Sequence, residues 1–437
     1  MILSRSALAA VFVVASTGLA AAADVGRPVP RPAAVDYVKV CDAYGAGFFA
    51  LPGTDTCIKI GGYVRAEYRI GDSNWARRST AAGTLGGYVG AQGWDQRSRN
   101  GAWSRSRVSM SIDARTQTEF GLLRSFQDIW MTLDTGAAGP TILIDNAYIQ
   151  FAGLTAGRAE SFFDFFTSYS YNRTLDYYSY TKVALLAYTA TLAKGVSMTV
   201  SVEDPTTGGR NTNGVTSEAG FYFGSKPGQG AYTGALKQPD FVAAFNLKQE
   251  WGQAQIAAAS HTVEGPATSA AGFAVMAGVK IGLPMLAKGD EMVLQTAYAR
   301  GATDFVASSN YQILSGTTPL ANLGADFVAD GAGFRSMHLT TAWNVIAGLR
   351  HNFTPRWQGN IGGALMSVDG YGNRDYRQFD LGGNIVYTAA PGFQISSGFE
   401  YRNVAFSNAT IADHSSATVT LRNAHILVGV VRLQRNL

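Results

Sequence analysis

Apolar and polar residues alternate with a spacing of two along most of the chain after residue 57. Between residues 58 and 70 the even positions are mostly apolar, whereas the odd positions carry all the charges. Residues 105–115 and 196–203 repeat this pattern. Successive side chains of a β-strand point to opposite faces of the sheet. Because a helical spacing of apolar residues is hard to find, the pattern predicts an all-β protein.

Sixteen such segments can be counted, with boundaries uncertain by a few residues. They cover residues 58–70, 104–116, 119–134, 141–152, 154–166, 183–193, 195–204, 239–249, 253–263, 272–283, 290–301, 337–353, 357–369, 376–389, 393–406 and 418–437. Short connections alternate with long ones rich in Gly, Ser, Thr and Asn, such as residues 71–103, 205–238 and 302–336. Strands of about ten residues with this alternation of turns are typical of an outer-membrane barrel.

A soluble β-sandwich also fits alternation alone, but it leaves strand edges that need protection, whereas a closed barrel has none. Aromatic residues gather toward strand ends, as in the interfacial girdles of membrane barrels. An even number of about sixteen strands leaves room for a water-filled channel. We therefore predict a 16-stranded antiparallel transmembrane β-barrel, with apolar residues facing lipid and charged residues facing the lumen.

Composition narrows the function. Hydrophobic residues make up 46% of the 437 residues and charged residues 15%, below the usual ~25%. After residue 23 no apolar run approaches the ~18 residues of a transmembrane helix, so helical spans are excluded there. A net charge of +4 without a block of basic residues gives no support for nucleic-acid binding.

The first 23 residues have the features of a signal peptide: Arg5, an apolar stretch over residues 7–15, and small residues at 21–23. We expect its cleavage before Asp24, the alternative being an uncleaved N-terminal anchor. Residues 24–57 are predicted to form a periplasmic lead-in with a disulfide loop, and residues 58–437 the barrel.

The two cysteines, Cys41 and Cys57, fit a disulfide because an exported chain with an even cysteine count forms such bonds readily. The bond would be worth about 3 kcal/mol in the chain-entropy model. The alternative, a metal-binding pair, lacks further Cys or His ligands nearby.

Four segments resemble the general porins of alphaproteobacteria. Residues 38–49 and 52–65 carry the two-cysteine motif, residues 147–154 resemble the turn before the fifth strand, and residues 429–437 resemble the last strand. The resemblance implies a homotrimer in outer-membrane lipid, assembled by the barrel-assembly machinery and passing small hydrophilic solutes. Such porins usually end in Phe, whereas this chain ends in Leu437, which puts assembly efficiency in question.

The resemblance also implies that the loop after the fifth strand, roughly residues 166–182, folds inward and constricts the pore. Its tyrosines could pack on the wall with their hydroxyls in water. The residues expected to form this constriction loop are Tyr169, Tyr171, Arg173, Asp176, Tyr177, Tyr178, Tyr180 and Lys182. An ordinary surface loop is the alternative.

Charged residues on the lumen face are the candidates for the pore wall, because charged rings in a constriction set ion preference. They are Arg65, Arg69, Arg105, Arg107, Arg124, Arg158, Glu160 and Asp164. The hypothesis is a transverse field, with acids on the inward loop and bases on the wall. The alternative is that these arginines are merely solvated or paired with Glu160 and Asp164.

The five histidines lack metal-ligand spacing, and neither a phosphate-binding loop nor a nucleophile motif occurs. We therefore predict no enzyme, no cofactor and no metal. The function expected is a passive outer-membrane channel for small hydrophilic solutes and ions. The alternative is a substrate-selective channel with a saccharide or nucleoside site at the constriction, which saturable block of conductance would reveal.

Overall fold

The computed structural model describes a large part of the chain from residue 40 onward. The described residues are 40–71, 87–88, 102–166, 168–169, 180–208, 210, 214–216, 222–223, 237–265, 267–306, 311–315, 318–322, 326–330, 335–372, 375–407, 410–412, 418–420 and 423–437. The predicted signal peptide and residues 24–39 of the predicted lead-in lie outside these residues.

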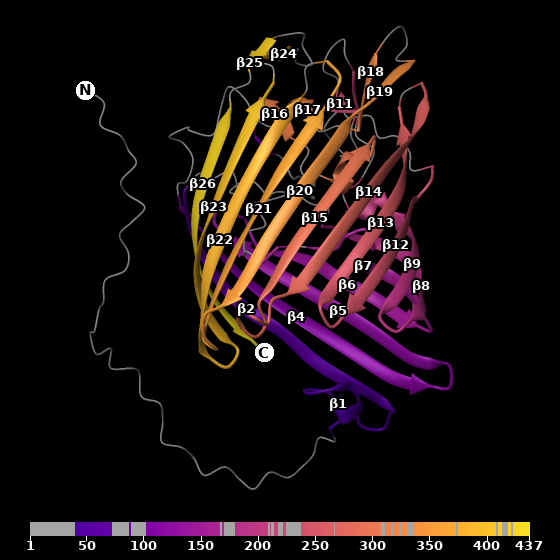
Figure 1. The fold of residues 1–437 in the computed structure, drawn as a ribbon, viewed down its shortest axis with the longest axis vertical. Coiled ribbons are helices and arrows are strands. Elements are labelled where there is room, and N and C mark those ends of the chain that lie inside the picture. Colours follow the sequence, from indigo (N-terminus) through magenta and orange to yellow (C-terminus); the bar gives the residue numbers. More distant parts are fainter. Residues whose placement is uncertain are drawn as a thin grey trace, which may run out of the picture. The chain divides into compact units, whose positions relative to one another are not determined.

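Sixteen antiparallel strands form one closed sheet (Figure 1). In order around the barrel they are β2 (Thr56–Gly71), β4 (Ala102–Thr118), β5 (Gly121–Asp134), β6 (Thr141–Phe151), β7 (Leu154–Glu160), β8 (Lys182–Ala193), β9 (Val196–Asp204), β12 (Asp240–Gln249), β13 (Gly252–Glu264), β14 (Ser269–Gly282), β15 (Glu291–Arg300), β20 (Thr341–Asn352), β21 (Trp357–Asp369), β22 (Tyr376–Ala390), β23 (Phe393–Phe406) and β26 (Ala424–Asn436). This confirms the predicted fold class.

The barrel closes where its first and last strands pair. Tyr63 of β2 lies opposite Asn436 of β26, and the register continues to Gly71 opposite Val428. The other edge of β2 pairs with β4, from Thr56 opposite Thr116 onward. Every wall strand therefore has a partner on both sides, which leaves no open edge.

Shorter elements lie outside the barrel wall. They are η1 (Asp42–Tyr44), β1 (Phe49–Ala50), β3 (Gly87–Tyr88), α1 (Pro205–Gly208), β10 (Gly214–Thr216), β11 (Tyr222–Phe223), η3 (Thr303–Phe305), β16 (Tyr311–Ser315), β17 (Thr318–Asn322), β18 (Phe327–Asp330), β19 (Ser336–Leu339), β24 (Thr410–Ala412) and β25 (Thr418–Thr420). None of the helices among the described residues is long and apolar enough to span a membrane.

Three predicted strands differ from the observed ones by more than three residues at one end. The strand expected over 154–166 ends at Glu160, because the aromatic residues that follow leave the wall and pack inside the barrel. The strand expected over 337–353 divides into β19 and β20 at Thr340, whose amide donates to the Asp326 carbonyl. The strand expected over 418–437 divides into β25, which pairs with β24, and the wall strand β26.

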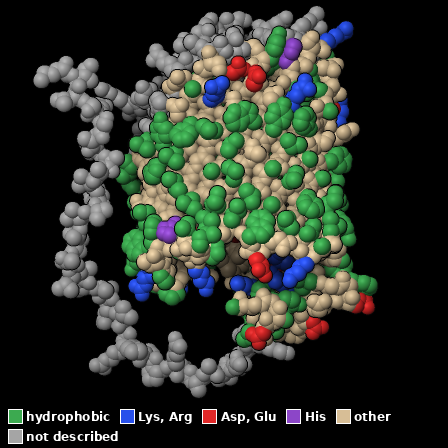
Figure 2. All heavy atoms as spheres, viewed as in Figure 1, with side chains coloured by type: hydrophobic (Ala, Val, Ile, Leu, Met, Phe, Trp, Pro, Cys, Tyr) green, Lys and Arg blue, Asp and Glu red, His purple; other side chains and the backbone are tan. Residues whose placement is uncertain are grey.

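The two faces of the wall differ as the alternation predicted. On β2, Ile60 and Val64 are more than half exposed, whereas Glu67 and Arg69 are only 3% and 2% exposed. Figure 2 shows hydrophobic side chains spread over the outer face of the described barrel, with charged side chains gathered near its two ends. A wall with apolar residues outside and charged residues inside fits a membrane channel, because lipid contacts the outer face and water contacts the inner face.

The two cysteines form a disulfide, Cys41–Cys57, with an S–S distance of 2.07 Å. It joins the start of β2 to η1 and closes a loop that also contains β1. Within this loop Phe49 pairs with Ile58 and Ala50 with Cys57, so β1 extends the sheet by two residues. The predicted disulfide is thus confirmed.

Candidate pore constriction

The chain leaves the barrel wall after β7 and runs into the interior. We call residues 161–166 together with 168–169 the inward segment; the chain returns to the wall through Tyr180 and Thr181 at the start of β8. The Ser161 amide donates to the Thr181 carbonyl at 3.1 Å, which closes the base of this excursion. The segment Phe162–Phe166 is rich in phenylalanine, so its burial inside the barrel removes apolar surface from water.

A buried carboxylate holds the first residues of the inward segment. Glu203, at the end of β9, is 1% exposed and accepts hydrogen bonds from the Ser161 hydroxyl (2.6 Å) and the Phe162 amide (3.1 Å). The Ser201 hydroxyl donates to the same carboxylate at 3.0 Å. Hydrogen bonds to a charged acceptor are about twice as strong as neutral ones, so they fix the point where the chain turns inward.

Arg210 links this carboxylate to a second one. Its guanidinium donates to Glu203 and to Asp164, at 3.1 Å in both cases, and also to the Ser161 hydroxyl at 2.8 Å. It also lies 4.0 Å from the ring centroid of Phe305 in η3. The side chains of Arg210, Glu203 and Asp164 are at most 2% exposed, so one guanidinium offsets part of the charge of two carboxylates away from bulk water.

A side-chain amide of β13 binds the backbone of the inward segment. Gln255 of β13 donates through Nε2 to the carbonyl oxygens of Phe162 (3.2 Å), Phe163 (3.4 Å) and Asp164 (3.2 Å). These three carbonyls belong to a turn that lacks strand partners, and a buried carbonyl without a partner is costly. Gln255 therefore satisfies backbone that the inward turn removes from the sheet.

Aromatic side chains dock the inward segment on the wall formed by β14, β15, β20 and β21. Phe163 packs edge-on against Phe305 at 4.9 Å between ring centroids. Phe166 and Tyr169 form a buried cluster with Val293, Ile346 and Ala364, which come from β15, β20 and β21. Phe165 occupies the space beside Gly278 of β14, where any added Cβ would overlap its ring.

The tip of the described segment carries a charged contact. The Arg350 guanidinium of β20 lies 4.5 Å from the ring centroid of Tyr169 and donates to Glu291 of β15 at 2.7 Å. Burial raises the pKa of the Tyr169 phenol, and the nearby Glu291 carboxylate acts in the same direction. The phenol therefore stays neutral at every physiological pH.

Arginines line the wall opposite the inward segment. In the ring of strands, β2, β4 and β5 lie about half a circumference from β14 and β15. Arg65 and Arg107 face each other across the β2–β4 pair, and Glu67 faces Arg105. We call Arg65, Arg69, Arg105 and Arg107 the arginine wall.

Each arginine of this wall is held by specific contacts. Arg105 binds Asp134 through two hydrogen bonds of 2.7 and 2.8 Å, Arg107 donates to the Thr132 hydroxyl at 2.8 Å, and Arg65 donates to Gln434 at 2.8 Å. Glu67 lies between Arg69 (3.2 Å) and Arg432 (2.5 Å). The guanidinium groups also stack on aromatic rings, including Arg107 on Trp130 at 4.5 Å. Such contacts fix positive charge toward the lumen.

The other predicted pore-wall residues are placed differently. Arg124 binds both oxygens of Asp113. Asp113 lies opposite Lys59, so this contact is closer to the start of β2 than the arginine wall is. Arg158 shares its strand face with Leu154, which is 46% exposed, and donates to the carbonyls of Ile144 and Thr207, so it lies apart from the arginine wall. Asp164 belongs to the inward segment because β7 ends before it.

Residues predicted for the constriction loop are only partly described. Tyr169 lies on the inward segment, Tyr180 packs against the cluster of Phe166 and Tyr169, and Lys182 contacts Glu160 at 3.1 Å beside the Tyr180 ring. The remaining predicted members lie outside the described residues: Tyr171, Arg173, Asp176, Tyr177 and Tyr178.

Residues that sequence reasoning missed hold the loop in place. Glu203 and Arg210 are 42 and 49 residues from Ser161, and Gln255 is 92 residues from Phe163. No motif links these three residues to the inward segment. One signal was available: Glu203 ends a strand face whose other residues, Ser197, Thr199 and Ser201, carry hydroxyl groups but no charge, and a buried acid there requires a partner.

Comparisons with known proteins agree with this architecture. A family model described as a porin subfamily matches residues 27–430. Porin Omp2b of Brucella suis is 27% identical over 98% of this chain and 97% of its own length, and Porin Omp2b of Brucella canis is 30% identical over 56% of this chain and 61% of its own length.

Solved structures show the same fold. The outer membrane channel DcaP of Acinetobacter baumannii superposes with a TM-score of 0.62 at 12% identity, covering 89% of this chain and 99% of its own. An anion-selective porin from Comamonas acidovorans gives a TM-score of 0.51 at 7% identity, covering 87% of this chain and all of its own. Because the family model spans nearly the whole chain, the chain belongs to the porin subfamily.

Proposed function

We propose that this porin is a passive outer-membrane channel in which small hydrophilic solutes and ions cross between the inward segment and the arginine wall. The observation that carries the proposal is the docking of the inward segment on β14, β15, β20 and β21, opposite the arginines of β2 and β4. A sixteen-stranded lumen is wide, so a segment crossing it sets the size limit.

The electrostatic part of the proposal is a transverse field. Arg210 offsets one of the two negative charges of Asp164 and Glu203 at the base of the inward segment, whereas the arginine wall carries four guanidinium groups within two adjacent strands. Glu67 and Asp134 offset part of this charge. An excess of fixed positive charge at a narrow point favours anions over cations.

Three finer features belong to the same proposal. The chain is exported through a cleaved signal peptide, residues 1–23, and the barrel-assembly machinery inserts it as a homotrimer, as the resemblance of its terminal segments implies. Conductance increments in groups of three in planar bilayers support the trimer, and single increments contradict it.

The test is ion selectivity, measured as the reversal potential in a salt gradient. The double variant Arg65→Glu, Arg107→Glu places negative charge at the centre of the arginine wall, so we expect selectivity to shift toward cations. The matched control is Lys288→Glu, Arg356→Glu, which makes the same charge change on exposed turns. Unchanged selectivity in the first variant, or equal shifts in both, contradicts the assignment of the arginine wall.

A further inference from the structure

A pocket lies at the end of the barrel where the short turns connect the strands. It has a volume of about 480 Å³, within the range of small-molecule sites. The disulfide loop supplies one side, with Tyr44, Ala46 and Phe48. The inner wall of β2, β4 and β5 supplies the other. The lining residues from the wall are Lys59, Gly61, Ser111, Asp113, Arg115 and Phe126. This hollow, which we call the mouth pocket, is separate from the pore constriction.

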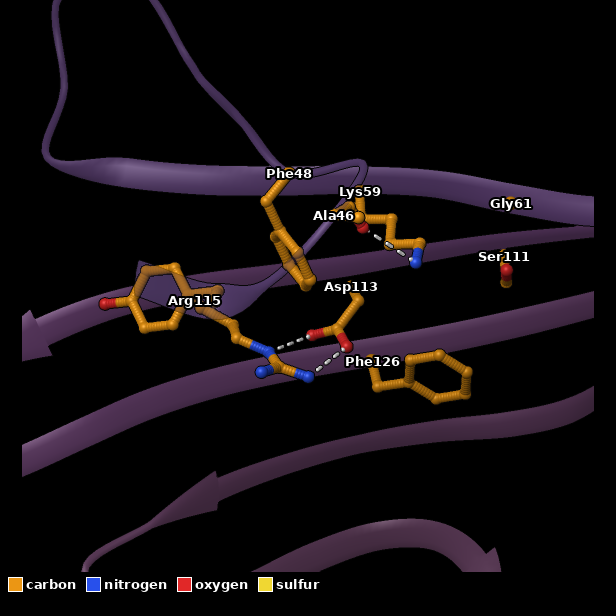
Figure 3. Close-up of a pocket in the computed structure, with 9 residues that line it drawn as sticks. Ala46, Phe48, Lys59, Gly61, Ser111, Asp113, Arg115 and Phe126 are labelled. Atoms are coloured by element: carbon orange, nitrogen blue, oxygen red, sulfur yellow. Dashed lines mark hydrogen bonds and ion pairs between the residues drawn. The ribbon is translucent and has the colours of Figure 1, made fainter. Parts of the chain in front are cut away.

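The disulfide loop is fixed over the wall by side-chain contacts. Lys59 donates to the Ala46 carbonyl at 3.1 Å, and Phe48 is 4% exposed. The Arg115 guanidinium lies 4.7 Å from the ring centroid of Phe48 and 5.9 Å from that of Tyr44. Figure 3 shows Phe48 pointing from the loop toward Asp113 and Arg115, with Phe126 on the neighbouring strand. The pocket is thus partly built by a covalently closed loop.

Charge in the mouth pocket favours an anion. Asp113 is its acidic lining residue, and its two oxygens accept hydrogen bonds from both Arg115 (3.0 and 2.8 Å) and Arg124 (2.9 and 3.0 Å). Two guanidinium groups on one carboxylate leave an excess of one positive charge, and the Lys59 ammonium adds another. A desolvated anion next to such groups is stabilised by charge-assisted hydrogen bonds.

Hydrogen-bond donors remain available beside this charge. Among the described residues, the Ser111 hydroxyl and the Nη1 group of Arg115 have no hydrogen-bond partner, and the Lys59 ammonium uses one of its three donors. Gly61, which faces the Ser111 hydroxyl, adds no side chain that would fill the space. The aromatic rings of Tyr44, Phe48 and Phe126 surround these donors with apolar surface.

We propose that the mouth pocket binds small aromatic carboxylates, with their carboxylate on Lys59, Ser111 and Arg115 and their ring among Tyr44, Phe48 and Phe126. This goes beyond passive diffusion, because it places a second selective site in series with the constriction. The disulfide loop forms one side of the pocket, so the site depends on the Cys41–Cys57 bond that holds this loop in place.

The probe is benzoate, with benzamide as its neutral analogue and acetate as the anion without a ring. Current through the reconstituted full-length channel is measured while each probe is added to either side. We expect benzoate to block current saturably and at lower concentration from the side of the short turns, with benzamide and acetate at least about tenfold weaker. Equal effects of benzoate and benzamide overturn the proposal.

Two variants test the residues. Lys59→Gln and Arg115→Gln should each weaken benzoate block about tenfold, the effect of losing one charge-assisted hydrogen bond. The matched controls, Lys288→Gln and Arg356→Gln, remove the same charges from exposed turns and should leave the block unchanged. Equal effects of the site and control variants show a general field and overturn the proposal.

Breaking the disulfide tests the proposal independently. Reduction with dithiothreitol, or the double variant Cys41→Ser, Cys57→Ser, should abolish the benzoate block while the open-channel conductance persists. Unchanged block after reduction overturns the role of the loop. Isothermal titration of benzoate into the detergent-solubilised protein measures binding without conduction, so a failure of the channel function remains distinct from a failure of the mouth pocket.

Discussion

Arg210 shows how strongly single residues constrain this barrel. Its guanidinium lies between two buried carboxylates, donates to a hydroxyl and packs on an aromatic ring, all at the base of the inward segment. Removing one partner of a buried ion pair leaves an uncompensated charge, which is strongly destabilising. The position of the constriction therefore depends on a residue that lies in neither the inward segment nor the pore wall.

We predict that Arg210→Met lowers the free energy of unfolding by about 3–5 kcal/mol, because Glu203 and Asp164 are then buried without a counter-charge. Urea unfolding of the protein in lipid vesicles measures this, and larger current noise in bilayers is expected as the inward segment loosens. The double variant Glu203→Gln, Arg210→Met should recover part of the loss. A loss below about 1 kcal/mol would contradict the role of this ion pair.

The sequence pattern predicts on which face of the wall a charged residue lies, but not which residues it contacts. Arg65, Arg69, Arg105 and Arg107 could be assigned to the inner face because alternation fixes the face of every strand residue. Alternation gives neither the inward turn nor contacts across the lumen. For Arg158 it argues against the pore wall, because period two places this arginine on the same face as Leu154, which is 46% exposed. Contacts made by residues far apart in the chain leave no periodic signal.

Strands were the most predictable elements, and the inward segment the least. Residues 161–166 carry aromatic residues that favour strands, so the pattern extended β7 six residues too far. In the structure the same aromatic rings dock on the inner wall instead of facing lipid. The deciding feature is small residues on that wall, such as Gly278 and Gly348, whose missing side chains make room for Phe165, Phe166 and Tyr169.

We predict that Gly278→Ala displaces the inward segment toward the lumen, since the added Cβ overlaps the Phe165 ring. Overpacking of this kind costs about 1–3 kcal/mol, and the single-channel conductance should fall as the passage narrows. Gly429→Ala is the control, because its nearest neighbour would be at 3.8 Å. Equal conductance of the two variants would show that Phe165 does not position the segment.

At the scale of the whole molecule, the outer face places apolar side chains where lipid lies. Ile256 of β13 is 65% exposed on that face, and Met285, on the turn between β14 and β15, is 75% exposed. Both residues are apolar and more than 60% exposed in the isolated chain, but only Ile256 lies on a wall strand, where lipid surrounds it. Exposure alone therefore does not predict the effect of a charge.

We predict that Ile256→Arg lowers the free energy of unfolding in vesicles by about 2–4 kcal/mol, the cost of arginine on the lipid face of a barrel. Met285→Arg should change it by less than about 0.5 kcal/mol, since that side chain meets water. Similar losses for both variants would show that β13 does not face lipid.

Closure of the barrel also has a kinetic consequence. The pairs that seal it join residues 63–71 with residues 428–436, so the seam cannot form until almost the whole chain has been exported. Contacts between such distant segments slow folding. Until then the free edges of β2 and β26 can pair with other chains, which makes aggregation the competing outcome. Assembly of the barrel therefore competes with aggregation for as long as this seam stays open.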